Sequence, residues 1–109
     1  MWICLSDSFL SIVAHRSKPD HLMVRARRPG DITKVFPEYQ EEFTPRADYL
    51  YRAVIPRGVV SEVLKSEVLM IKYDNFKNSV RDNQLHNAYA DFWSIMYDFQ
   101  SRFKSKFKV

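Results

Sequence analysis

The sequence predicts an α+β fold, a two-layer sandwich in which helices pack on one face of an antiparallel sheet of about four strands. Aromatic and β-branched residues fill short segments near the N-terminus, whereas apolar residues at helical spacing dominate the C-terminal half. The expected order of elements is therefore βββαβαα. A chain of 109 residues supports one hydrophobic core, so we expect a single domain.

The N-terminal segments predict a three-stranded meander. Residues 1–6 and 9–16 are rich in aromatic and branched side chains, and the polar "SDS" between them suits a tight turn. The turn residues of "SKPD" follow, and residues 21–28 return as the third strand. In the next segment we expect Asp31 to cap a short helix that Pro37 ends.

The acidic stretch "EYQEEFTPRAD" is predicted to be a mobile loop, and "YLYRAVI" predicts the fourth strand. A helix is then expected from Pro56 or Gly58. The polar "KYDNFKNSVRDN" is interpreted as a capped connection between helices, with a docking loop as the alternative. The last helix starts near Asp82 or Asn83 and carries a continuous apolar stripe, which we expect to pack in the core. That stripe consists of Leu85, Ala88, Tyr89, Phe92, Met96, Phe99 and Phe103.

The formal net charge of +4 is unevenly distributed. Four cations lie in a C-terminal stretch that has no acid after Asp98. Without these four, the number of Lys and Arg residues is 13 instead of 17, which equals the 13 Asp and Glu. The sequence thus predicts a neutral domain over residues 1–101 and a basic tail over 102–109. The four tail cations are Arg102, Lys104, Lys106 and Lys108.

Cysteine content and hydropathy limit the compartment and the cofactor chemistry. Cys4 is the only cysteine, which excludes an intramolecular disulfide and a Cys-rich zinc site. The apolar N-terminal run lacks a basic n-region, and no stretch approaches the roughly 20 apolar residues of a membrane span. We therefore expect a cytoplasmic protein with no membrane partner and no cofactor.

The stretch "VRARRPGDI" places arginines at the end of the third strand. Because side chains alternate along a strand, Arg25 and Arg27 are expected on the open face of the sheet, joined by Tyr49 or Tyr51 and by His15. An open face with arginines and aromatic rings binds single-stranded nucleic acid through phosphate contacts and base stacking. The structural alternative is that the same residues form cross-strand pairs and protect the sheet from edge pairing.

The sequence offers little for catalysis. His15, His21 and His86 lie on different predicted elements, and two glycines are too few for a phosphate-binding glycine-rich loop. A general acid and base from His15, His21 and Asp20 is the remaining enzymatic hypothesis, a small hydrolase. We expect no catalytic residue and no metal site.

Several segments together resemble a family of short hypothetical proteins of bacteria and their phages. They are "FLSIVAHR", "VRARRPGDITKVFP", "DYLYRAVIPR", "YDNFKNSVRD" and "AYADFWSIM", and the resemblance extends from Met1 to about Tyr97. It implies a compact independent protein and no catalytic residues.

The leading hypothesis is a small non-enzymatic binding protein, a phage accessory factor that inhibits a host nucleoprotein complex by docking on an acidic protein or nucleic-acid surface. The alternative is a protein that binds single-stranded nucleic acid directly through the same face. The oligomeric state is left open. The candidate binding residues are Arg25, Arg27, Arg28, Tyr51, Arg52, Lys104 and Lys106.

Overall fold

The computed structural model describes residues 1–104 and confirms the α+β class, with an open antiparallel sheet. The sheet has five strands where the sequence predicts about four, in the order β1-β2-β3-β5-β4. The strands are β1 (Trp2–Cys4), β2 (Phe9–Ala14), β3 (His21–Ala26), β4 (Glu42–Phe43) and β5 (Tyr51–Pro56). The helices are α1 (Asp31–Val35), α2 (Arg57–Leu69), α3 (Phe76–Ser79) and α4 (Asn83–Lys104).

The predicted meander of β1, β2 and β3 is confirmed, and β5 pairs with the far edge of β3. The additional strand, β4, lies in the segment predicted to be a mobile loop. Its two residues, Glu42 and Phe43, pair with Arg52 and Tyr51 of β5. Two residues are too few to show the alternation by which a strand is recognised in a sequence.

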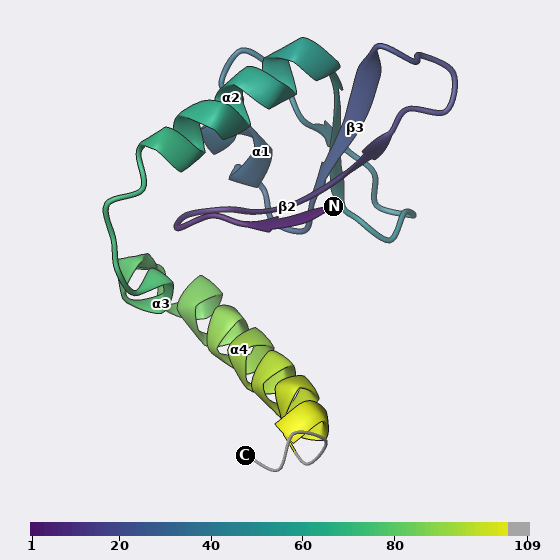
Figure 1. Ribbon diagram of the computed structural model, residues 1–109. Helices are drawn as coiled ribbons and strands as arrows, with labels where there is room; N and C mark the ends of the chain where they lie inside the picture. The colour runs from purple at the N-terminus through teal and green to yellow at the C-terminus, as the bar shows by residue number, and fades with distance from the viewer. Residues whose placement is uncertain (105–109) are drawn as a thin grey trace.

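The main core lies between one face of the sheet and the helices α1 and α2. Val24 and Ala26 of β3 are fully buried in it, as the alternation predicts, together with Ile32 of α1 and Val60 of α2. Figure 1 shows α1 and α2 on one side of β2 and α4 on the other. α4 therefore departs from the arrangement of the first two helices.

Asp31 does not cap α1 as predicted. The N-cap position is Gly30, whose φ of 87° lies in the left-handed region that glycine adopts without strain. The Asp31 side chain is instead buried, with 2% of its surface exposed, and it accepts the backbone N–H of Phe9 at 3.2 Å. Arg28 supplies the opposite charge, with Nη2 3.1 Å from Asp31 Oδ1.

The connection between α2 and α4 is capped as predicted. The Asn75 side chain accepts the backbone N–H of Asn78 at the start of α3, and the Asp82 carboxylate accepts the N–H of Leu85 at 2.9 Å. This second bond holds the pKa of Asp82 below its usual value, and nearby Arg28 adds to the effect. Asp82 also forms an ion pair with Arg28 at 3.3 Å, so one arginine joins the end of β3 to the start of α4.

The predicted core stripe of α4 is only partly buried. Leu85 and Tyr89 form a second small cluster with Val80, against which Cys4 and Phe9 pack. The stripe then leaves the sheet: Met96 and Phe99 are 48% and 46% exposed, so core packing is wrong for the distal half of the helix. The radius of gyration is 16.1 Å, above the roughly 13 Å of a compact domain of this size, because α4 projects from the body.

We predict that Asp31→Ala lowers the free energy of unfolding by about 2 kcal/mol, because it leaves the Phe9 N–H and Arg28 without their buried acceptor. Urea denaturation followed by circular dichroism measures the change. Asp20→Ala is the matched control, since the Asp20 side chain is 83% exposed and this variant should unfold almost as the wild type does. Equal stability of the two variants would contradict the structural role of Asp31.

Candidate functional site

Two of the predicted arginines surround a buried tyrosine. The guanidinium carbons of Arg25 and Arg27 lie 4.4 and 4.1 Å from the centre of the Tyr49 ring, which is 4% exposed. Arg25 also donates to the hydroxyl of Ser11 at 2.7 Å, across the β2–β3 pair. Each cation–π contact of this kind stabilises by about 0.5–2 kcal/mol.

Tyr51 does not join the arginines, although it is a predicted binding residue. It pairs with Ala26 in the β3–β5 register, so its ring points to the core face, where it lies 5.5 Å from the ring of Phe43. Tyr49 precedes the regular part of β5 and occupies the arginine face instead. The sequence predicts either Tyr49 or Tyr51 on this face, and in the structure Tyr49 is the one that lies there.

Arg52 and Arg28 also have partners within the fold. Arg52 stands directly opposite Arg25 in the register, a like-charge pair that costs stability unless it is compensated. The carboxylate of Asp48 provides the compensation, 3.0 Å from Arg52 Nη2. The four predicted sheet arginines therefore contact aromatic rings, carboxylates or carbonyl groups of their own chain, which supports a structural role for them.

Lys104, the first of the two predicted lysines, lies apart from the sheet. Lys104 is on the last turn of α4, where its Nζ is 5.3 Å from the centre of the Tyr97 ring. Lys106 lies outside the residues that the structure describes.

The histidines of the hydrolase hypothesis flank the exposed turn between β2 and β3. His21 Nδ1 is 2.8 Å from the Asp20 carboxylate, and this hydrogen bond lowers the pKa of Asp20. His15 Nδ1 accepts the backbone N–H groups of Ser17 and Lys18, each at 3.1 Å. Within residues 1–104, no group of three His, Cys, Asp or Glu side chains could hold a metal ion.

A large exposed apolar surface on α4 includes Met96, Phe99 and Phe103, which the sequence predicts to pack in the core. We call it the α4 surface, and it comprises the large apolar side chains that α4 exposes beyond Phe92. They are 42–64% exposed. Its residues are Trp93, Ile95, Met96, Tyr97, Phe99 and Phe103. A cluster of exposed large apolar side chains of this kind is typical of an interaction site.

A signal for this surface is present in the sequence. Without Ala88, the residues of the stripe from Leu85 to Phe103 are spaced by four and three residues in turn, which is the a/d pattern of a coiled-coil seam. A helix packed in a globular core shows a wider apolar face at a period of 3.6 residues. The a/d spacing therefore suits a helix that pairs with another helix, and Trp93 and Ile95 lie on the flanks of that seam.

The first turns of α4 are held firmly against the β1–β2 hairpin. The Tyr89 hydroxyl lies 2.9 Å from the carbonyl oxygens of both Leu5 and Ser8. Burial raises the pKa of Tyr89 far above that of an exposed tyrosine, so the hydroxyl remains a donor at neutral pH. This anchor fixes the direction in which the distal half of α4 projects.

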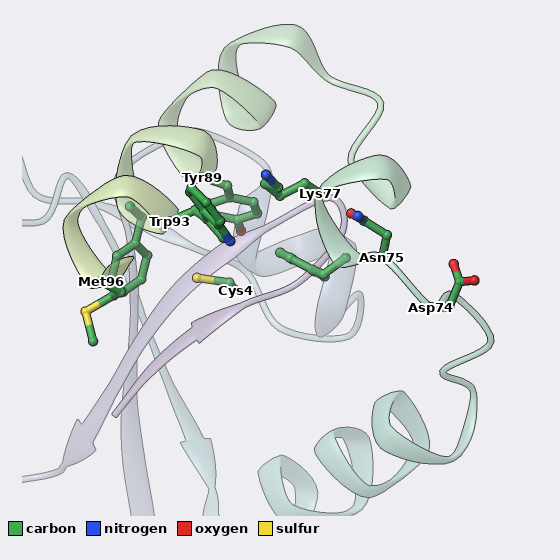
Figure 2. A pocket seen from close by; sticks show the side chains of 9 residues that line it. Cys4, Asp74, Asn75, Lys77, Tyr89, Trp93 and Met96 are labelled. Atoms are coloured by element: carbon green, nitrogen blue, oxygen red, sulfur yellow. The ribbon is translucent and has the colours of Figure 1, made fainter. Parts of the chain in front are cut away.

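An open pocket of about 490 Å³ lies where the anchored and projecting halves of α4 meet. Figure 2 shows Tyr89, Trp93 and Met96 of α4 around the thiol of Cys4, with Lys77 of α3 nearby. The Lys77 ammonium is 4.4 Å from the centre of the Trp93 ring. Burial raises the pKa of the Cys4 thiol, which favours its protonated form.

No family model, no curated protein and no solved structure matches this chain. The resemblance to the family of short bacterial and phage proteins thus stays a prediction. Of the helices in residues 1–104, none is long and apolar enough to cross a membrane.

We predict that Arg25 and Tyr49 are energetically coupled. Arg25→Ala and Tyr49→Leu should each lower the free energy of unfolding, and the double variant should lose about 1 kcal/mol less than the sum of the two. A double-mutant cycle by chemical denaturation measures this coupling. Arg46→Ala, in the exposed loop before Tyr49, is the control and should show none. Additive losses for Arg25 and Tyr49 would rule out the contact.

The Tyr89 anchor predicts a loss of stability in alkali. An unfolded chain ionises its tyrosines near pH 10, whereas folded Tyr89 keeps its proton to higher pH. The unfolded state then binds fewer protons than the folded state, so the free energy of unfolding falls as the pH rises above about 10. Between about pH 9 and 11, the free energy of unfolding measured in urea should fall less steeply for Tyr89→Phe than for the wild type. For the control Tyr97→Phe, on the exposed half of α4, this free energy should fall as steeply as for the wild type.

Proposed function

We propose that this chain is a non-enzymatic binding protein that acts by docking the α4 surface on another protein. The observation that carries the proposal is the large apolar surface on a helix whose N-terminal half is anchored and whose distal half projects from the sheet. Aromatic residues and methionine are the types enriched at the centres of protein interfaces. The internal pairing of the sheet arginines supports α4, rather than the sheet face, as the binding element.

The narrower hypothesis, an accessory factor that modulates a nucleoprotein complex, stays within this proposal. Arg102 and Lys104 lie at the distal end of the α4 surface, where the helix dipole favours cations. They suit a partner whose surface is acidic around an apolar centre.

Direct binding of single-stranded nucleic acid is a second candidate because of a specific arrangement on the same helix. Cations lie over three of its exposed rings: Lys77 over Trp93, Lys104 over Tyr97, and Arg102 over Phe99 at 5.9 Å. Aromatic rings next to cations can stack bases and contact phosphates. The two candidates differ in whether nuclease abolishes binding.

The test is a tagged pull-down from source-cell lysate with and without nuclease, using the full chain and two variants. We predict that a protein is retained after nuclease by the wild type, is lost with Phe99→Glu, and is kept with Leu69→Glu, a control on α2 where the side chain is 74% exposed. Recovery of nucleic acid alone, removed by nuclease, would select the second candidate. Equal recovery by all three proteins would overturn the role of the α4 surface.

A further inference from the structure

The α4 surface has the pattern of one half of a helix pair. In a heptad register, Phe92 and Phe99 occupy d positions and Met96 occupies an a position, with Trp93 and Ile95 on the flanking e and g positions. A seam of this kind supercoils with a helix of matching pattern. The occupant must therefore present a similar apolar stripe.

We propose that the occupant is α4 of a second copy of this chain, packed antiparallel. This inference rests on the proposed function, because it names the partner of the same surface. A two-fold axis makes such an interface self-complementary, so residues of one copy meet the same set on the other. The register that fits places Met96 opposite Phe99 of the second copy, and Phe92 opposite its Phe103.

The charges on α4 distinguish the two possible directions. In the antiparallel register Arg102, on the g flank, is level with Trp93 of the second copy. Asp91 of that copy, at a c position on the flank that Arg102 meets, lies two residues away, about 3 Å along the helix axis. A long arginine side chain spans that offset. In a parallel pair, Arg102 and Lys104 would instead lie beside the same residues of the second copy, and these like charges would repel each other. Antiparallel packing also aligns opposite ends of the two helix dipoles.

The pocket beside Phe92 fits the same register. It opens where the two helices would first meet, and its walls are apolar and aromatic, from Tyr89, Phe92, Trp93 and Met96. Its volume of about 490 Å³ accommodates a large side chain of the second copy as a knob in a hole. The register brings an aromatic residue, Phe103 of the second copy, to this position.

The available area is adequate for a dimer. Side chains of this size carry roughly 200 Å² each. Six of them at about half exposure offer on the order of 600 Å² per chain, close to the ~800 Å² per partner of a stable complex. The uncovered edges of the pocket add to this surface.

The test is sedimentation velocity of the full chain from about 1 µM to 1 mM. The wild type should sediment with twice the chain mass of 13.0 kDa. Phe99→Glu should be monomeric with unchanged helical circular dichroism, since the side chain is exposed, whereas Leu69→Glu should remain dimeric.

The direction of packing is tested by charge exchange. Asp91→Arg and Arg102→Asp should each weaken the dimer about tenfold, and the double variant should restore it. Failure of the double variant to recover would overturn the antiparallel register. A monomeric wild type, or a dimer that persists with Phe99→Glu, would overturn the self-association. In that case the pull-down tests the proposed function separately. Protein capture that depends on Phe99 would support the proposed function, and capture that does not depend on Phe99 would overturn it as well.

Discussion

The buried carboxylate of Asp31 is the contact on which the arrangement of the molecule depends. It accepts a backbone N–H from β2 and the guanidinium of Arg28 at the end of β3. Arg28 in turn pairs with Asp82, the residue that caps α4. Three segments distant in the sequence are thus joined through one nearly buried charge, whose burial is tolerable because it is paired and hydrogen-bonded.

The two faces of the sheet are stabilised by different interactions, apolar burial on one and cation–π contacts and an ion pair on the other. One face carries the apolar core under α1 and α2, where burial of aliphatic side chains provides the stability. The other carries Arg25, Arg27 and Arg52, which contact the ring of Tyr49 and the carboxylate of Asp48. Cations placed over an aromatic ring are partly desolvated, and each such contact adds about 0.5–2 kcal/mol of stability to this face.

The local periodicities were sufficient to predict much of the fold, and the long-range pairings were not. Alternation correctly placed Val24 and Ala26 in the core and Arg25 on the other face, because a strand has two sides whatever its neighbours are. Nothing local distinguishes Tyr49 from Tyr51, since their faces depend on where β5 becomes regular and how it registers with β3. Asp31 was misassigned for a similar reason: its partners Phe9 and Arg28 are brought to it only by the folded sheet.

The distal half of α4 poses a question of stability that the chain alone does not answer. Beyond Phe92, its described residues belong to neither buried cluster, although Lys77 of α3 lies over Trp93. Pairs along the helix add to this contact, such as Trp93 stacked on Tyr97 at 5.2 Å and Phe99 against Phe103 at 5.3 Å. Each such pair contributes about 0.2–0.5 kcal/mol, and an isolated helical segment of this length is marginal in water. The segment continues from the anchored half of α4, which supplies the helical nucleus. In the proposed antiparallel pair, a helix of the same sequence covers those rings with matching spacing and charge and adds to this stability.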